Sequence, residues 1–310
     1  MIRAVAAVWL ALAATGATAG DIAFVTAQNA DEVAVVELET GRIRATVPVP
    51  GAPAPVAYDP ATGRAAVIAA ETGEMTLLDA QGTVLGRVPL GEGAFGLAFA
   101  PGGDLLVADW YGARLRRLDP SGTSARWSVP TGRAPAGIAL SGDGGIVAVA
   151  ERDDDRLSAF DAVSGQPLWQ AATGSHPYAV VFHDDRFWTS DVQSRTVTAV
   201  EAATGAPVGS VATGDHPYGV AFAAGKGFVT DQYAGTVTVF DPRSLQPLDR
   251  IAVGDYPEGI AALSDGRRLA VASWDSDTLT ILDGGTLAIA RVIDMPSGPR
   301  SFGLFVGPDR

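Results

Sequence analysis

A repeat of about 41 residues is the strongest constraint on the fold of this chain. Residues 215–222 (DHPYGVAF) recur as residues 175–182 (SHPYAVVF) and, in part, as residues 255–260 (DYPEGI). Weaker copies define one column, which reads Pro53, Ala94, Pro135, Pro177, Pro217, Pro257 and Pro299, with spacings of 41, 41, 42, 40, 40 and 42 residues. A constant period of this size indicates an array of similar supersecondary units.

Each unit contains four short strand-like segments. In one unit these are residues 219–223, 227–230, 236–240 and 247–253, which are rich in Val, Phe, Thr and Ile and are separated by turn residues. Beyond the N-terminal segment, no helical periodicity extends over ten residues. Four short antiparallel strands in about 40 residues are typical of a propeller blade, so we expect an all-β, seven-bladed β-propeller.

The two ends of the chain are expected to share one blade. Residues 299–305 supply a single strand, whereas residues 22–27, 32–37 and 42–49 supply three. Pairing of residues 299–305, including Phe302, with residues 22–27 would close the ring and protect strand edges that attract other chains. We therefore predict one propeller domain over residues 20–310.

The units resemble YVTN-type (YncE-like) β-propeller repeats. The resemblance rests on segments such as residues 253–260 (VGDYPEGI), each followed by a strand and a turn that contains aspartate, and it covers essentially all of residues 20–310. It implies a seven-bladed ring that is often secreted. The family has diverse roles and no universal set of catalytic residues, so the resemblance implies the fold more strongly than the function.

The first 19 residues have the layout of a secretory signal peptide. Arg3 is followed by a short apolar run over residues 4–14 and by Ala17-Thr18-Ala19, which fits an A-x-A cleavage site. The run is too short to span a bilayer, which takes about 20 apolar residues, and no later segment is long or apolar enough to span one. We therefore expect a cleaved signal peptide and a periplasmic or secreted mature protein without a membrane span.

Composition excludes several classes of function. The chain has no cysteine, so a thiolate metal site, a cysteine nucleophile and a CxxCH haem attachment are ruled out. A net charge of −13 argues against nucleic acid as a partner, because binding to phosphates requires a basic surface. The sequence also contains neither a Gly-x-Ser-x-Gly motif nor a phosphate-binding P-loop.

The proline column marks one end of the central channel. Each innermost strand begins there, so we call this end of the ring the upper face; the loops between second and third strands share it. Residues directly after the column are Ala54, Phe95, Ala136, Tyr178, Tyr218, Glu258 and Arg300. Residues directly before it are Ala52, Gly93, Ala134, His176, His216, Tyr256 and Gly298. The large polar and aromatic members of these sets are expected to surround the channel mouth.

This mouth has the composition of a small-molecule site, which combines aromatic walls with a few polar groups. The residues predicted to contact a ligand are Trp110, Tyr178, Tyr218, Tyr233, Tyr256, Glu258, Trp274 and Arg300. Arg300 together with the tyrosine hydroxyls could bind a carboxylate or a phosphate. For Trp110 and Trp274, packing between blades is an equal alternative.

A divalent metal such as zinc is a second hypothesis for the same mouth. His176 and His216 occupy equivalent positions in adjacent blades, and Asp191, Asp231 or Glu258 could complete the ligand set. The alternative, which we favour, is that the histidines belong to polar loops. On this alternative the acids Asp109, Glu151, Asp191 and Asp231 bind free backbone N–H groups of turns.

The sequence predicts a periplasmic, non-catalytic binding or adaptor propeller that holds a small ligand, a metal ion or a partner protein at the channel mouth. One alternative is a metal-assisted enzyme similar to virginiamycin B lyase or to lactone hydrolases, with His216 or His176 as general base. Another is an accessory subunit of a periplasmic redox system.

Overall fold

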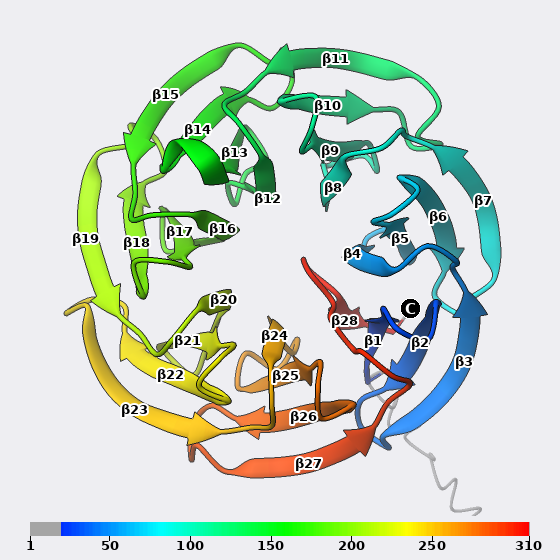
Figure 1. The fold of residues 1–310 in the computed structure, drawn as a ribbon, viewed down its shortest axis with the longest axis vertical. Coiled ribbons are helices and arrows are strands. Elements are labelled where there is room, and N and C mark those ends of the chain that lie inside the picture. The colour runs from blue at the N-terminus through cyan, green and yellow to red at the C-terminus, as the bar shows by residue number, and fades with distance from the viewer. Residues whose placement is uncertain (1–19, 310) are drawn as a thin grey trace, which may run out of the picture.

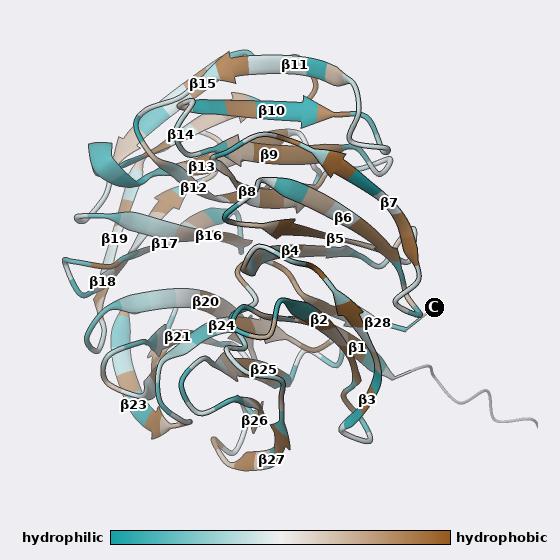
Figure 2. Ribbon diagram, turned by 45° about the vertical axis from the view of Figure 1, so that its right-hand side comes forward, coloured by the Kyte–Doolittle hydropathy of each residue, from teal (hydrophilic) through white to brown (hydrophobic). Residues whose placement is uncertain are grey.

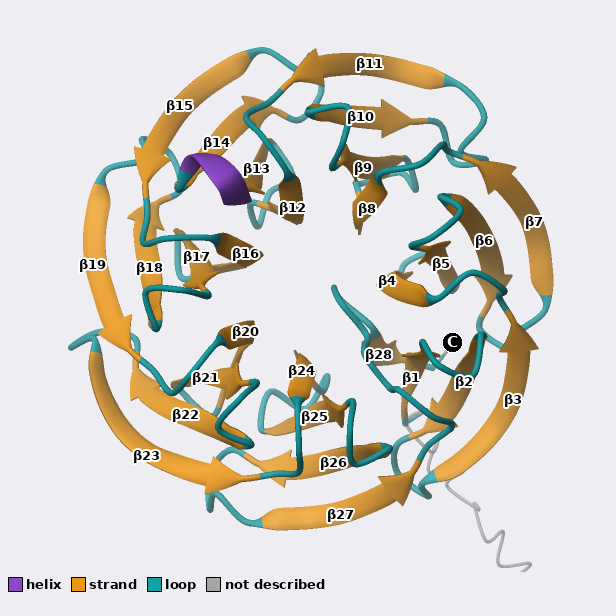
Figure 3. Ribbon diagram, viewed as in Figure 1, coloured by secondary structure: helices purple, strands orange, loops and turns teal. Residues whose placement is uncertain are grey.

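Seven four-stranded antiparallel sheets surround a central channel in the computed structural model, which describes residues 20–309 (Figure 1). The predicted seven-bladed β-propeller is confirmed. Apart from one turn of 3-10 helix at Arg152–Asp154, the described chain consists of strands, turns and loops (Figure 3). No helix among residues 20–309 is long and apolar enough to cross a membrane. The predicted signal peptide lies outside the described residues.

The blades are numbered from the N-terminus, and their strands run from the channel outward. Blade 1 contains β28 (Val306–Pro308), β1 (Asp21–Ala27), β2 (Glu32–Glu37) and β3 (Arg42–Pro48). Blade 2 contains β4 (Pro53–Asp59), β5 (Arg64–Ala69), β6 (Glu74–Asp79) and β7 (Val84–Pro89). Blade 3 contains β8 (Ala94–Phe99), β9 (Leu105–Asp109), β10 (Arg114–Leu118) and β11 (Ala125–Pro130).

Blades 4 to 7 repeat this order. Blade 4 contains β12 (Pro135–Leu140), β13 (Ile146–Glu151), β14 (Arg156–Asp161) and β15 (Pro167–Ala172). Blade 5 contains β16 (Pro177–His183), β17 (Arg186–Asp191), β18 (Thr196–Glu201) and β19 (Pro207–Ala212). Blade 6 contains β20 (Pro217–Ala223), β21 (Lys226–Asp231), β22 (Thr236–Asp241) and β23 (Gln246–Ala252). Blade 7 contains β24 (Pro257–Ala262), β25 (Arg268–Ser273), β26 (Thr278–Asp283) and β27 (Ile289–Asp294).

The core lies between neighbouring blades. The two middle strands of each sheet carry most of the fully buried side chains, for example Phe228 of β21 and Val239 of β22. The outermost strands, such as β23 and β27, are mostly exposed. Figure 2 shows hydrophobic segments in brown on middle strands such as β5 and β9. Burial of both faces of the middle strands explains their continuous Val, Ala, Leu and Phe content.

The chain closes its ring through blade 1, as predicted, but the pairing differs from the prediction in detail. β28 pairs with β1 through Val306–Pro308, whereas Phe302 forms a parallel bridge with Pro55 at the edge of β4. The prediction that Phe302 pairs with residues 22–27 is therefore wrong. The two ends of the predicted segment do contact β1: Pro299 forms an antiparallel bridge with Ala27, and the Phe24 N–H donates to the Phe305 carbonyl at 2.9 Å. Residues 302–304 between these ends follow β4 instead, and Gly303 has a φ of +123° that favours glycine.

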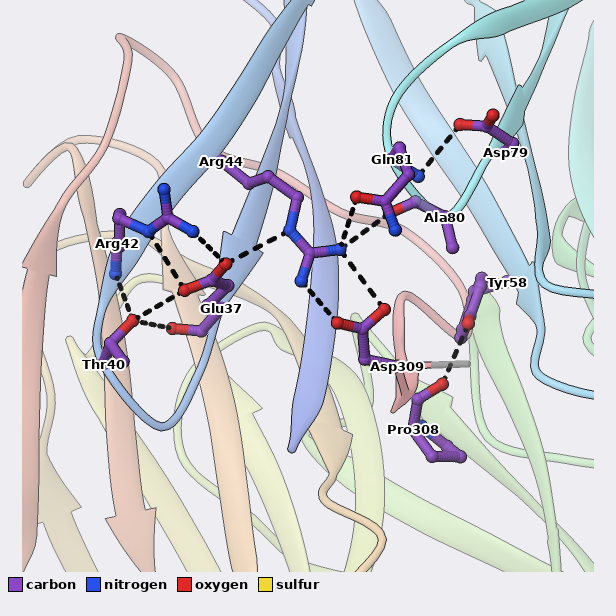
Figure 4. A network of polar contacts seen from close by, with 10 residues as sticks. All are labelled: Glu37, Thr40, Arg42, Arg44, Tyr58, Asp79, Ala80, Gln81, Pro308 and Asp309. Atoms are coloured by element: carbon purple, nitrogen blue, oxygen red, sulfur yellow. Dashed lines mark hydrogen bonds and ion pairs between the residues drawn. The ribbon is translucent and has the colours of Figure 1, made fainter. Parts of the chain in front are cut away.

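A polar network on the lower face holds this closure together (Figure 4). Arg44 Nη1 donates a hydrogen bond to Asp309 Oδ1 at 3.2 Å, and Arg44 Nε lies 3.2 Å from Glu37. The Tyr58 hydroxyl donates to the Pro308 carbonyl at 2.9 Å. These contacts join residues of β2, β3 and β4 to the C-terminal residues, so closure does not depend on the short β28 ladder alone.

A backbone pattern repeats at the start of every innermost strand. The residue before the proline column has a positive φ in all seven units, including His176, His216 and Tyr256. In β4, β8, β12, β16, β20 and β24, the ladder register shifts directly after the column. Such irregularities redirect side chains. The two features together turn the residues beside the column toward the upper mouth of the channel.

Candidate functional site

A cavity of about 490 Å³ occupies the upper mouth of the channel. We call it the upper cavity. Its lining residues are Trp110, Arg152, Tyr178, Val192, Gln193, His216, Tyr218, Gln232, Tyr233 and Arg300. This lining contains two arginines and a histidine but no carboxylate, although the chain as a whole has a net charge of −13. The cavity therefore presents guanidinium groups to its interior, while the carboxylates paired with them, Glu258 and Asp153, lie outside its lining.

Aromatic rings fill the channel beneath the upper cavity. The ring centroids of Tyr178 and Tyr218 lie 4.5 Å apart, and those of Tyr178 and Phe302 lie 4.7 Å apart. Phe95 lies 5.2 Å from Phe302 and 6.0 Å from Tyr178. We call Phe95, Tyr178, Tyr218 and Phe302 the aromatic plug. Tyr178 and Tyr218 were predicted to contact a ligand, and the structure shows that both rings also pack together as this floor.

Arg300 enters the floor from the C-terminal segment. Its Nη2 donates to the Tyr218 hydroxyl at 2.6 Å and its Nη1 donates to Gln28 Oε1 at 3.0 Å. The guanidinium carbon also lies 5.7 Å from the centroid of the Tyr218 ring, a cation–π contact. A guanidinium has five N–H donors. Arg300 is therefore fixed in orientation and retains N–H donors for a ligand.

Glu258 is the counter-ion of Arg300. Arg300 Nε lies 2.6 Å from Glu258 Oε2, and Gln232 Nε2 donates to Glu258 Oε1 at 2.5 Å. Glu258 is only 4% exposed, and this burial raises its pKa, while the Arg300 charge and the Gln232 hydrogen bond act in the opposite direction. Glu258, which was predicted to contact a ligand, therefore lies behind Arg300 and does not line the upper cavity.

The tyrosines of the floor form a second link in this chain of contacts. The Tyr218 hydroxyl donates to the Tyr178 hydroxyl at 2.8 Å while it accepts from Arg300. Burial raises the pKa of both phenols, and the Glu258 charge raises that of Tyr218 further. Both hydroxyls therefore remain neutral near pH 7 and act as hydrogen-bonding groups.

Arg152 and Trp110 form the opposite wall. The Arg152 guanidinium carbon lies 5.6 Å from the Trp110 ring centroid, and its Nη1 donates to Asp153 at 2.6 Å. Trp110 in turn lies 6.4 Å from Tyr178. Arg300, Tyr218, Tyr178, Trp110 and Arg152 thus form a continuous series of contacts. Two guanidinium groups lie at the ends of this series, with three aromatic rings between them.

An aromatic ladder extends from the upper cavity along the rim. His216 stacks on Tyr233 at 3.7 Å, Tyr233 lies 5.4 Å from Tyr256, and Tyr256 lies 6.2 Å from Trp274. His216 and Tyr233 line the cavity, whereas Tyr256 and Trp274 do not. Of the eight predicted ligand residues, the structure places five in the lining, namely Trp110, Tyr178, Tyr218, Tyr233 and Arg300.

The four predicted metal ligands are not brought together. Among residues 20–309, no group of three or more His, Cys, Asp or Glu side chains could hold a metal ion. His216 Nδ1 lies 2.9 Å from Asp215, and His176 Nδ1 lies 3.0 Å from Ser175 Oγ, so each ring contacts the residue before it. The structure therefore gives no support to the metal hypothesis.

The acids of the predicted metal site have structural contacts. Asp191 accepts hydrogen bonds from the hydroxyls of Thr196 at 2.8 Å and Thr198 at 2.6 Å. Asp231 accepts from the Thr238 hydroxyl at 2.7 Å and from the Gly214 N–H at 2.8 Å. Burial raises the pKa of Asp191 to about 6 and raises that of Asp231. Both carboxylates join strands within their blades and are closed to solvent.

Four lining residues are absent from the predicted ligand contacts: Arg152, Val192, Gln193 and Gln232. Arg152, Gln193 and Gln232 were expected at the mouth beside the acids Asp109, Glu151, Asp191 and Asp231, whereas Val192 was not singled out. A signal for three of them exists within the repeat. Trp110, Arg152, Val192 and Gln232 each directly follow the acid that ends the second strand of blades 3 to 6. Trp110 was selected from this column because it is aromatic, although the same position contributes a lining residue in all four blades.

Comparisons with known proteins support the architecture. A family profile, PQQ_2, described as outer membrane protein assembly factor BamB, matches residues 56–191, which is less than half of the chain. No curated protein sequence matches significantly. A crystal structure of a protein of unknown function from Desulfotomaculum acetoxidans DSM 771 is similar, with a TM-score of 0.79 and 12% identity over 93% of this chain and 99% of that chain.

The dihydro-heme d1 dehydrogenase NirN, solved in complex with DHE, is also similar in structure. Its TM-score is 0.65, with 15% identity over 89% of this chain and 73% of that chain. At these identities both solved structures support the propeller fold alone.

Proposed function

We propose that this protein is a periplasmic, non-catalytic binding propeller whose upper cavity holds a small anion with an aromatic or otherwise planar body. One observation carries the proposal: the lining has two arginines and no carboxylate, while the chain has a net charge of −13. Guanidinium groups bind carboxylates and phosphates through paired N–H donors. A cationic cavity in an acidic protein concentrates anions from solution.

The aromatic surface supports the planar body of the ligand. Trp110, Tyr178 and Tyr218 lie between Arg152 and Arg300 in the contact series, so a ligand that reaches either arginine also contacts these rings. Aromatic rings prefer offset or edge-to-face contacts with other rings. The cavity of about 490 Å³ is within the range of small-molecule sites.

Calorimetric titration of the mature protein tests this function. We expect naphthalene-2-carboxylate to bind at least tenfold more tightly than the neutral naphthalene-2-carboxamide, and the difference to shrink as salt is added. Arg152→Gln should weaken binding of the acid by about tenfold, which corresponds to 1.4 kcal/mol. Arg243→Gln is the matched control, because Arg243 lies on an exposed turn next to β22. Equal affinity for the acid and the amide would contradict the proposal.

Periplasmic localisation is part of the proposal. Residues 1–19 have the three parts of a signal peptide, and we propose that cleavage leaves Gly20 as the first residue of a periplasmic protein. The YVTN-type assignment belongs to the same proposal, because its repeats recur over the whole described ring. Mass spectrometry of the protein from a periplasmic extract measures the mature N-terminus directly, and a mass that retains residues 1–19 would contradict cleavage.

Service as an adaptor in a protein assembly is a second candidate. It is favoured by the match of residues 56–191 to the profile of outer membrane protein assembly factor BamB. It is also supported by exposed aromatic side chains on the upper face: Tyr111 is 78% exposed and Tyr233 is 54% exposed. Aromatic residues are enriched at protein–protein interfaces. Co-purification that is lost with Tyr111→Ser but retained with Arg152→Gln would favour this candidate over the anion site.

A further inference from the structure

A second cavity of about 520 Å³ lies in the lower part of the channel, beyond the aromatic plug. We call it the lower cavity. It is lined by residues of the innermost strands β4, β8, β12, β16, β20 and β24 and by Ser301, Phe302, Gly303 and Leu304 of the C-terminal segment. Tyr178 and Tyr218, which form the floor of the upper cavity, do not belong to this lining. The lower cavity is therefore a separate site on the same axis.

The wall of the lower cavity is mainly apolar. Leu97, Ile138, Val181, Phe222 and Ile260 each come from a different innermost strand and line it. Its charged or titratable lining residues are Tyr58, Asp59, His183 and Glu258. His183 stacks on Phe222 at 4.0 Å, and Glu258 is paired with Arg300. An occupant of this cavity would thus bury apolar groups.

Strand edges also face this cavity. Within residues 20–309, β8, β12, β16, β20 and β24 are each the last strand of their sheet on the channel side. The N–H and C=O groups on such an edge have no partner strand, and they are a template for an added extended chain. Proteins that bind an extended peptide by strand addition use open strand edges together with apolar pockets, and the lower cavity has both an apolar wall and open edges.

The chain itself shows how an extended segment is held there. The Phe302 N–H donates to the Ala54 carbonyl at 3.0 Å, and the Val56 N–H donates to the Phe302 carbonyl at 2.9 Å. The Tyr58 N–H donates to the Leu304 carbonyl at 2.7 Å. Residues 302–304 therefore lie parallel to β4 and cover its edge, whereas the other five inner edges are bounded by the cavity. Leu304 remains 56% exposed.

We propose that the lower cavity receives an extended apolar segment of a partner protein, which adds as a strand to one of the five open inner edges. Residues 302–304 on β4 are the intramolecular precedent for this mode. The segment should carry basic flanking residues, because the chain has a net charge of −13 and Asp184, beside the lower rim residue His183, has a largely exposed side chain. This inference does not depend on the anion site in the upper cavity.

Fluorescence anisotropy with a labelled peptide, Lys-Ser-Phe-Gly-Leu-Phe-Lys amide, tests the inference on the whole mature protein. Its central residues copy residues 301–305 of the chain. The control peptide, Lys-Ser-Pro-Gly-Pro-Phe-Lys amide, lacks two of the N–H donors that strand addition requires. We expect the first peptide to bind at least tenfold more tightly than the second. Hydrogen exchange should slow at residues of the inner strands, such as 97–99 or 138–140.

Two variants place extra bulk in the lower cavity. Ala98 and Ala139 line it and are partly accessible, so we expect Ala98→Phe and Ala139→Phe each to weaken peptide binding by tenfold or more. Val84→Phe is the matched control, because Val84 lies on the exposed outer strand β7 and is 41% exposed. Thermal unfolding checks that each variant is folded, and two positions are used so that one unstable variant does not decide the result.

Several outcomes would overturn the inference. Equal binding of the proline peptide would exclude strand addition. Binding of the apolar dye Nile red that Ala139→Phe abolishes, without any binding of the peptide, would assign the cavity to small apolar molecules instead. Peptide binding that Arg152→Gln weakens while Ala98→Phe and Ala139→Phe leave it unchanged would place the peptide in the upper cavity. If the peptide behaves as expected while naphthalene-2-carboxylate fails to bind, only the proposed anion function is wrong.

Discussion

Arg300 and Glu258 form an ion pair of 2.6 Å between Nε and Oε2 at the base of the upper cavity. The carboxylate is almost fully buried, whereas the Arg300 side chain is 22% exposed. The pair therefore presents its cationic partner to the cavity and hides its anionic partner. Because Glu258 still offsets part of the Arg300 charge, it should set the strength with which the cavity attracts anions.

The first prediction concerns Glu258→Gln. Removal of the carboxylate leaves the Arg300 charge unopposed, so we expect the affinity for naphthalene-2-carboxylate to rise by about fivefold. We also expect the free energy of unfolding to fall by roughly 3–5 kcal/mol, since a largely buried charge loses its partner. Calorimetry measures the first effect and urea unfolding the second. An unchanged or lower affinity in a folded variant would show that Arg300 does not attract the ligand.

A pH dependence follows from the same carboxyl group. Burial raises the pKa of Glu258 above 4.5, so the group becomes protonated as the pH falls toward that value from neutrality. Naphthalene-2-sulfonate keeps its charge in this range, and we expect its affinity for the unmodified protein to increase as the pH is lowered. In Glu258→Gln this increase should vanish. A parallel increase in both proteins would assign the effect to another group.

Asp191 should make the stability of the protein depend on pH. Burial raises its pKa from 3.8 to about 6 in the folded state, so the folded protein binds a proton more tightly than the unfolded chain does. The contribution of Asp191 to the free energy of unfolding is therefore fully present below pH 4. This contribution, about 2–3 kcal/mol in total, is lost as the pH rises through about 6. Asp191→Asn, which keeps an acceptor for Thr196 and Thr198, should remove this part of the pH dependence. Urea unfolding from pH 4 to pH 7 compares the two curves, and curves of equal slope would contradict the prediction.

The buried carboxylates of Asp191 and Asp231 require glycine at two positions shortly before the proline column. A Cβ on Gly214 would lie 2.4 Å from Asp231 Cγ, and one on Gly174 would lie 2.7 Å from Asp191 Oδ2. Gly214→Ala should lower the free energy of unfolding by about 1–3 kcal/mol, since the buried carboxylate cannot move aside. Gly86→Ala is the control, because nothing lies within 4 Å of a Cβ at this partly exposed position of the outer strand β7. A similar effect of both substitutions in urea unfolding would refute this steric explanation.

Ring closure predicts a strong effect of the C-terminal residues. Deletion of residues 306–310 removes β28 and the contacts of Pro308 and Asp309 with Tyr58 and Arg44. It also exposes the edge of β1, so we expect a lower melting temperature and concentration-dependent association. Asp309→Asn, which removes only the charge, should cost no more than about 1 kcal/mol. Light scattering with thermal unfolding measures both effects, and a truncated protein that stays monomeric with an unchanged melting temperature would contradict this account.

The repeat made the architecture predictable from the sequence. One proline column and four apolar segments per unit determined the number of blades and placed the strands of blade 6 within two residues of β20 to β23. The pairing of Phe302 was not predictable in this way. A strand pattern specifies which face is buried, but it does not specify which of two neighbouring edges a segment with a glycine such as Gly303 will follow.

The sequence was sufficient to predict which residues surround the channel mouth, but only in part to predict what each of them does there. Residues beside the proline column do surround it, because the positive φ and the ladder irregularity recur in each unit. The roles of Tyr178 and Glu258 depend on contacts across the channel between blades far apart in sequence, such as the aromatic plug. The spacing of residues within one repeat gives no information about contacts between distant blades. The lower cavity escaped prediction for a related reason, since its walls consist of residues that also form an ordinary apolar core pattern.

The C-terminal segment has a consequence for biosynthesis. The Arg300 N–H donates to the Thr26 carbonyl, and β1 pairs with β28. These contacts join positions that are about 275 residues apart. A chain that emerges from the N-terminus onward can assemble blades 2 to 7 one after another, but blade 1 stays incomplete until residues 299–308 have been made. Non-local pairing of this kind is slow to form. The contacts that complete the native state therefore arise last, and blade 1 keeps an open strand edge until the C-terminal residues are available.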